Sequence, residues 1–307
     1  MTIQTLRRAI AAGLLALAAQ PAGAEITTVT PERTDRLPVD LLADIQFASN
    51  DHGFKRDELY LDLLRPITDA PVPVVVFVLG SGWSPVEAER VLPQLTFLAQ
   101  AGFAVASIDY RGIGEAPFPA AQQDAKRAIR FLRANGAAYG LDPGAIGVMG
   151  NSAGGHIALL AGLGADDAFA EEGAASGGDS GVRAIAAIYP AIYLREMASD
   201  PLGPVNAHLG MMAGDEENAE AVADALPETH LDAGDPPVLL IHGTADPVVP
   251  VDQSERFHDA LDAAGIDATL LRVDGLGHSI EDMLTTRQVA ETLVDFFDRT
   301  LRAPDRD

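Results

Sequence analysis

Short apolar runs rich in β-branched residues recur along the chain, and they constrain its fold more than any other feature. The clearest is VPVVVFVL at residues 72–79, in which polar and apolar residues do not alternate. Such a run is typical of a strand that is buried on both faces in the middle of a parallel sheet. Further strands are predicted at residues 59–64, 103–110, 146–150, 182–190, 237–243 and 268–273.

Segments with apolar residues at helical spacing separate these strands. Helices are predicted at residues 86–102, 120–140, from 153 onward, 252–264 and 279–301. The alternation predicts an α/β fold, with one mostly parallel central sheet and helices on both faces. The segment 191–236 is long for a connection between two strands, so we predict a small helical lid insertion there. The alternative is a plain connecting helix packed on the sheet.

Residues 1–24 have the pattern of a secretory signal peptide. Arg7 and Arg8 precede the apolar run AIAAGLLALAA (9–19), and AGA (22–24) fits a signal-peptidase site. A buried N-terminal helix is the alternative. The run is shorter than the ~20 residues that span a bilayer, and the chain has no cysteine to carry a lipid, so we expect no stable membrane anchor. We expect export to the periplasm or the medium and one α/β domain over residues 25–307.

The charge balance narrows the possible partners. The formal net charge is −24, from 45 acidic and 21 basic residues among 307. Such a field repels phosphate backbones and anionic lipid, which argues against nucleic acid as a partner. The oligomeric state cannot be inferred from these features.

One serine is bracketed by glycines where an apolar strand ends and an apolar helix begins. The stretch reads GVMGNSAGGHIALL (147–160), so Gly150, Ser152 and Gly154 form a Gly-x-Ser-x-Gly pattern. This arrangement predicts a sharp strand-to-helix turn with an exposed nucleophile, where side chains at 150 or 154 would collide with their neighbours. The turn also presents the Ala153 N–H at a helix N-terminus, which favours an oxyanion. An incidental serine in a glycine-rich turn is the alternative.

A serine hydroxyl needs a base, and the base needs an orienting acid. Asp246 follows the strand at 237–243 within HGTADPVVP, and His278 follows the last strand within GLGHS. Both therefore lie at the carboxyl edge of the sheet, which also carries Ser152. The three groups follow one another in the order nucleophile, acid, base, which is typical of hydrolases with this turn.

Other histidines and aspartates of the chain are alternatives for the base and the acid. His156 and His242 are alternative bases, but we expect His156 to pack locally and His242 to hold the acid loop. Asp252 and Asp274 are alternative acids. The remaining histidines stand among polar neighbours and are expected to be solvated: His52, His208, His230 and His258. No metal-ligand spacing occurs, so no catalytic metal and no cofactor are expected.

The loop after the strand at 72–79 is the candidate source of a second oxyanion donor. It reads Leu79-Gly80-Ser81-Gly82-Trp83, and its small residues allow backbone N–H groups to approach a ligand closely. The alternative is a tight turn with a packed tryptophan.

Together, the motifs GSGW, DYR with APFP, GNSAGG, HGTADPVVP and GLGH resemble those of α/β-hydrolases of the acetyl-esterase/lipase type, close to the hormone-sensitive-lipase and feruloyl-esterase-like groups. The resemblance runs from about Leu59 to the C-terminus. It implies a carboxylic-ester hydrolase with a Ser152–His278–Asp246 triad, and an oxyanion hole formed by the N–H groups of Ser81, Gly82 and Ala153. It also implies short-chain acyl esters, acetyl or feruloyl-like, of small molecules or polysaccharides.

The chain departs from this family at one place. The family usually has His-Gly-Gly-Gly-Trp where this chain has Leu79-Gly80-Ser81-Gly82-Trp83, so Ser81 is expected to bring a side chain into a crowded place.

Two other functions are alternatives to the ester hydrolase. One is a serine peptidase of the prolyl-oligopeptidase type, and the other is a non-catalytic binding protein on a hydrolase scaffold.

Overall fold

The structure is a computed structural model that describes residues 36–49, 58–163, 169 and 178–302. The predicted signal peptide at residues 1–24 lies outside this part of the chain, and so does His52.

The described residues form one eight-stranded sheet in the order β1-β2-β4-β3-β5-β6-β7-β8. The six strands from β4 to β8 along this order run parallel, whereas β2 is antiparallel to β4 and β1 is antiparallel to β2. The predicted mostly parallel sheet is therefore confirmed. The strands are β1 (Val39–Ser49), β2 (Glu58–Pro66), β3 (Val72–Val78), β4 (Ala104–Ile108), β5 (Leu141–Asn151), β6 (Ala184–Ile188), β7 (Val238–Gly243) and β8 (Ala268–Val273).

The edge strand β1 is not among the strands predicted from the sequence. Its segment, VDLLADIQFAS, lacks a steady alternation because two register shifts interrupt its pairing with β2, and Asp44 has a φ of 56°. An irregular strand of this kind is common at a sheet edge, where only one side must be paired. Its hydrophobic pattern is therefore too broken to be read as a strand.

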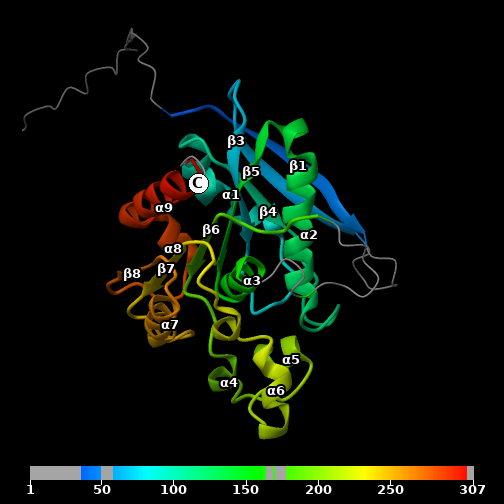
Figure 1. Cartoon of the computed structure of the whole chain (residues 1–307), viewed down its shortest axis with the longest axis vertical. Coiled ribbons are helices and arrows are strands. Elements are labelled where there is room, and N and C mark those ends of the chain that lie inside the picture. Colours follow the sequence, from blue (N-terminus) through cyan, green and yellow to red (C-terminus); the bar gives the residue numbers. More distant parts are fainter. Residues whose placement is uncertain (1–35, 50–57, 164–168, 170–177, 303–307) are drawn as a thin grey trace, which may run out of the picture. The chain divides into compact units, whose positions relative to one another are not determined.

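Helices cover both faces of the sheet, as predicted. Helix α1 (Leu92–Gln100) packs with α9 (Arg287–Leu301), whereas α2 (Ala120–Asn135) packs with α3 (Ala153–Gly162) (Figure 1). In β5 a side chain at Gly147 would meet Phe297 of α9, whereas one at Gly150 would meet α3. Positions 147 and 150 differ in parity, so the two pairs of helices lie on opposite faces. Helix α7 (Asp252–Ala263) packs beside β7 and β8.

Three predicted helices have different bounds, and the one predicted at residues 120–140 is α2 followed by a 3₁₀ helix, η2 (Gly136–Tyr139). Residues 88–91 form a short 3₁₀ helix, and α1 begins at Leu92 with Pro93 in its first turn, because proline fits there without losing a hydrogen bond. The last predicted helix is two helices, α8 (Ile280–Thr285) and α9, because Thr286 has an extended backbone between them.

Residues 191–236, called the insert below, lie between β6 and β7. They contain the short helices α4 (Leu194–Met197), α5 (Pro204–Leu209), η3 (Glu216–Asn218), α6 (Ala219–Ala223) and η4 (Pro227–His230). Figure 1 shows α4, α5 and α6 beyond the ends of the strands. That the insert acts as a lid stays a prediction.

Candidate active site

Ser152 stands at the turn between β5 and α3. Its φ of 54° and ψ of −125° lie in a region that costs of order 1–3 kcal/mol for a residue with a side chain. Two close crossings enforce this turn. A Cβ atom at Gly150 would overlap the Gly154 carbonyl, and one at Gly154 would overlap the Val78 carbonyl of β3. The predicted collisions at 150 and 154 are confirmed, and they explain why both positions lack side chains.

His278 lies between Ser152 and Asp246. Its Nε2 atom is 2.9 Å from Ser152 Oγ, and its Nδ1 atom is 2.7 Å from Asp246 Oδ2. A carboxylate only accepts hydrogen bonds, so Nδ1 carries the proton and donates it to Asp246. Nε2 is then the acceptor for the Ser152 hydroxyl. The structure thus brings the three predicted residues together in the arrangement that activates a serine.

The surroundings of Asp246 keep it ionised. Burial is the largest influence and by itself would raise its pKa. The hydrogen bond from His278 and those from the Val248 and Val249 N–H groups (2.8 and 2.9 Å) outweigh it, so the pKa of Asp246 lies below its usual value. The alternative acids bond elsewhere: Asp274 accepts from the Thr244 hydroxyl at 3.0 Å, and Asp252 lies 3.8 Å from Arg256.

His242 supports the loop that carries Asp246. Its Nε2 lies 2.9 Å from the Val249 carbonyl, and its Nδ1 lies 2.7 Å from the Ser254 hydroxyl. Nε2–H donates to the carbonyl, and burial lowers the pKa of His242, so the ring is neutral. The expected role of His242 in holding the acid loop is confirmed.

The predicted oxyanion donors lie at two neighbouring chain segments. Ala153 is the first residue of α3, and Ser81 and Gly82 follow β3, which pairs with β5 through Val78 and Gly150. Within the part of the chain that the structure describes, the N–H groups of Ser81, Gly82 and Ala153 donate no hydrogen bond. They therefore retain the capacity to bind an oxyanion.

The expectation that Ser81 crowds this loop is wrong. Its side chain is exposed, and its hydroxyl donates to the Ser84 carbonyl at 2.5 Å. The crowded position is Gly80, where a Cβ atom would overlap the Asn151 carbonyl. Because Ser81 points to solvent, a serine fits there as well as a glycine would.

Asn151 and Tyr189 are site residues that the sequence analysis did not find. Asn151 is buried, accepts a hydrogen bond from the Gly80 N–H at 3.0 Å and donates one to the Tyr189 hydroxyl at 3.3 Å. The Tyr189 ring lies 4.3 Å from the His278 ring, centroid to centroid. Asn151 therefore links the oxyanion loop to the packing of the base. Its place between Gly150 and Ser152 was the available signal.

Two further histidines lie near the oxyanion loop. His156 is buried, but its partners are not local as expected, because its ring bonds to Trp83 and to the Ala225 carbonyl, 73 and 69 positions away in the chain. The expectation that His208 is solvated is wrong, because it is 3% exposed and stacks on Trp83. Trp83 lies 125 positions before His208 in the chain, and only folding brings the two side chains together.

In the described segments, no three His, Cys, Asp or Glu side chains converge where they could hold a metal ion. A search of the same segments for a helix with the length and hydropathy of a membrane span found none.

A serine in a strained turn, a histidine–aspartate pair and free N–H donors at one edge of this sheet define an α/β-hydrolase. The chain belongs to the BD-FAE family, whose model matches residues 61–261. Residues 218–307 also match the model of TAP-like proteins.

Esterase LipQ of Mycobacterium tuberculosis is 32% identical over 249 residues, which are 78% of this chain and 59% of that protein. The chain thus spans about three fifths of the length of this curated relative. A carbohydrate esterase from gut microbiota has a TM-score of 0.77 and 29% identity, over 88% of this chain and 99% of that structure. Esterase Est2 of Thermogutta terrifontis, with propionate bound, has a TM-score of 0.68 and 25% identity, over 88% of this chain and 97% of that structure.

Proposed function

We propose that this protein is a serine carboxylic-ester hydrolase that acts through Ser152, His278 and Asp246. The observation that carries the proposal is the continuous hydrogen-bonded chain from the Ser152 hydroxyl through both nitrogens of His278 to Asp246. Membership of the BD-FAE family and the similarity to esterases support the same chemistry.

The first half-reaction forms an acyl-enzyme. His278 Nε2 takes the proton of Ser152 Oγ as this oxygen attacks the ester carbonyl. The negative charge that develops on the carbonyl oxygen is stabilised by the N–H groups of Ser81, Gly82 and Ala153. Asp246 stabilises the imidazolium that forms. His278 then donates its Nε2 proton to the leaving alcohol, and Ser152 keeps the acyl group.

The second half-reaction releases the acid. Water enters in place of the alcohol, His278 takes its proton, and the resulting hydroxide attacks the acyl carbonyl. Collapse of this second tetrahedral intermediate returns the proton to Ser152 and frees the carboxylic acid. Every proton moves between Ser152, His278, water and the alcohol, so no other reactant is required.

The proposed substrates are short-chain acyl esters, acetyl or feruloyl-like, on a small molecule or a polysaccharide. A cavity of about 500 Å³ lies beside the oxyanion loop, between Leu79–Ser81 and residues 85–90. Glu87 and Arg90 are among its lining residues, so it offers charged hydrogen-bonding groups beside apolar ones. The resemblance to a carbohydrate esterase and to an esterase with bound propionate also supports short-chain acyl esters as substrates. The pattern of residues 1–24 supports export, to the periplasm or the medium.

Labelling and hydrolysis test the proposal together. The wild-type protein is expected to hydrolyse p-nitrophenyl acetate and to react covalently with a fluorophosphonate probe. Ser152→Ala is expected to lose both while it keeps its melting temperature. Ser49→Ala, which changes an exposed serine of β1, is the matched control and keeps full activity. Labelling of Ser152→Ala at the wild-type rate would refute the assignment.

A substrate panel then defines the acyl and alcohol parts. It contains p-nitrophenyl esters of increasing chain length, acetylated xylan, methyl ferulate and a p-nitroanilide. Short acyl esters are expected to have the highest kcat/KM. Cleavage of the anilide in preference to all esters would indicate a peptidase instead.

A further inference from the structure

The tryptophan of the oxyanion loop is held in an unusual backbone conformation. Gly82 has a φ of 63° and Trp83 one of 58°, so two successive residues are left-handed and one of them carries a large side chain. Such a conformation persists only where the surroundings enforce it. The Gly82 N–H is a proposed oxyanion donor, so whatever holds Trp83 also determines where this donor points.

His156 binds the edge of the Trp83 indole. The indole Nε1–H can only donate, and it lies 3.2 Å from His156 Nδ1, so Nδ1 is the acceptor. The proton of the neutral ring is then on Nε2, which donates to the Ala225 carbonyl at 2.8 Å. Burial lowers the pKa of His156 to about 4, which is consistent with a neutral ring. His156 thus connects α3, just after Ser152, with both Trp83 and the insert.

His208 of the insert binds the face of the same indole. The two rings are stacked with their centroids 4.7 Å apart and their planes within 10°. The His208 backbone is itself fixed, because its carbonyl accepts a hydrogen bond from the Phe118 N–H at 2.7 Å. His208 Nε2 is buried and has no partner among the described residues, so the stacked face, not a ring nitrogen, makes the contact with Trp83.

A second residue of the same helix lies beside the loop. A Cβ atom at Gly82 would lie 3.5 Å from Pro204 Cβ, which is ordinary contact distance. Pro204 and His208 are four residues apart in α5 and therefore share one face of this helix. That face stacks on Trp83 and lies beside Gly82, two successive residues of the oxyanion loop.

We infer that α5 of the insert sets the geometry of the oxyanion hole, and that His208 is a positioning residue that acts by stacking on Trp83. The inference rests on the proposed esterase function and goes beyond it. It means that the insert cannot swing away as a lid without releasing Trp83, so it is a fixed part of the catalytic site.

Two substitutions separate stacking from simple filling of space. His208→Phe keeps a flat ring on Trp83, whereas His208→Leu fills a similar volume without one. We expect His208→Leu to lower kcat by about tenfold or more, a fraction of the 10²- to 10³-fold loss typical when an oxyanion donor is removed, with KM changed by less than about threefold. His208→Phe should retain kcat within about threefold of the wild type.

A second substrate pair reports on the oxyanion hole alone. A thionoester carries sulfur in place of the carbonyl oxygen and gains less from N–H donors than the matching ester does. His208→Leu should therefore lower the ratio of kcat/KM for the ester to kcat/KM for the thionoester. A general loss of folded protein would reduce both values equally and leave this ratio unchanged. Trp83→Leu, which removes the ring on which His208 stacks, should lower the same ratio, and it tests the inference independently if His208→Leu does not fold.

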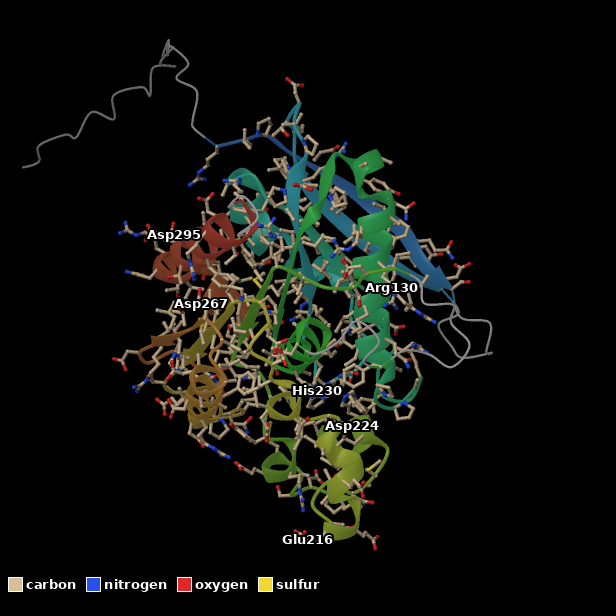
Figure 2. All side chains as sticks on the ribbon, in the orientation of Figure 1. Arg130, Glu216, Asp224, His230, Asp267 and Asp295 are labelled. Carbon is tan, nitrogen blue, oxygen red and sulfur yellow. The ribbon has the colours of Figure 1, made fainter. Side chains whose placement is uncertain are left out.

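His230→Ala is the matched control, because His230 is also a histidine of the insert, but its ring donates to the Asp224 carbonyl within the insert itself (Figure 2). It should leave kcat and the ester preference unchanged. The inference is overturned if folded His208→Leu keeps the wild-type kcat, or if its ester preference is unchanged. It is also overturned if His208→Phe is as impaired as His208→Leu. Failure of the wild type to hydrolyse esters or to label at Ser152 would instead refute the proposed function.

Discussion

His278 can act only if its proton sits on the nitrogen that faces Asp246. The Asp246 side chain has no exposed surface and accepts three hydrogen bonds, so it holds the imidazole in one tautomer and one orientation. Ser152 and His278 would still be adjacent without this carboxylate, but nothing would then keep Nε2 free to accept the serine proton.

Asp246→Asn is accordingly expected to lower kcat by about 10⁴-fold, the loss known for a triad that has the wrong tautomer. The amide can donate to Nδ1 and thereby moves the ring proton to Nε2. Steady-state hydrolysis of p-nitrophenyl acetate measures the loss. Asp274→Asn, in the next strand's loop, is the control and should stay within about twofold of the wild type. A larger loss in Asp274→Asn than in Asp246→Asn would identify a different acid.

Asn151→Leu removes both hydrogen bonds of this side chain and keeps its branched shape. We expect kcat to fall about tenfold or more, because the Gly80 N–H and the Tyr189 hydroxyl both lose their partner beside the oxyanion loop and His278. Tyr189→Phe breaks only one of these bonds and should be less impaired. Equal kcat values for the wild type, Asn151→Leu and Tyr189→Phe would show that the hydrogen bonds of Asn151 play no part in catalysis.

At this scale, the predictable residues are those whose roles follow from position in the chain. Ser152 directly follows β5, and Asp246 and His278 lie in the loops after β7 and β8, so strand order brings all three to one edge. Asn151, Tyr189 and His208 act through contacts with residues 38 to 125 positions away in the chain. No local pattern encodes such contacts, which is why the sequence analysis missed the first two and misjudged the third.

The turn between β5 and α3 shows how one element fixes the site. The α3 backbone at Gly154 lies directly against the Val78 carbonyl at the end of β3, so the nucleophile turn and the oxyanion loop touch. The sequence predicted this close approach because only glycine allows it. It could not predict β1, whose pattern is broken by register shifts, or the break between α8 and α9 at Thr286.

Gly154→Ala should destabilise the protein by more than about 3 kcal/mol, because the added methyl group meets a backbone carbonyl that cannot move aside without disturbing β3. Urea unfolding followed by circular dichroism measures the change in the free energy of unfolding. Gly214→Ala is the control, since an added Cβ atom there meets nothing within 4 Å. A Gly154→Ala protein as stable as Gly214→Ala would mean that the turn is less tightly packed than described.

The molecule as a whole combines an acidic surface with buried neutral histidines. Glu216, Asp224, Asp267 and Asp295 are exposed examples of the acidic side chains (Figure 2). Inside, burial lowers the pKa values of His156, His208 and His242. The charge balance was evident from composition, but the burial of these histidines follows only from the fold.

The buried histidines should make stability depend on pH in a definite direction. The pKa of His156 is about 4 in the folded protein and about 6.5 when the chain is unfolded, so between these values the unfolded state binds more protons. The contribution of neutral His156 to the free energy of unfolding is fully present above pH 6.5. It falls as the pH drops toward 4, by roughly 3 kcal/mol for His156 alone.

Urea unfolding at pH 7.5 and pH 5.0 tests the direction of this pH dependence. The wild-type free energy of unfolding should be lower at pH 5.0, and His156→Phe should shrink that difference by about 2 kcal/mol, because the variant has no group to titrate there. His258→Ala, which removes a partly exposed histidine of α7, should leave the difference unchanged. An undiminished difference in His156→Phe would show that other groups cause it.

The pairing of β3 with β5, in which Val78 lies beside Gly150, has a practical consequence for protein engineering. The approach of the Ser152 turn to the loop after β3 is set by main-chain hydrogen bonds between adjacent strands, which do not depend on the identity of most side chains, whereas the inferred role of α5 is to orient the donors within that loop. Designers could therefore exchange much of the interior of α1, α2 and α9 to raise thermal tolerance. Turnover should persist in such redesigned proteins up to the temperature at which the sheet itself comes apart.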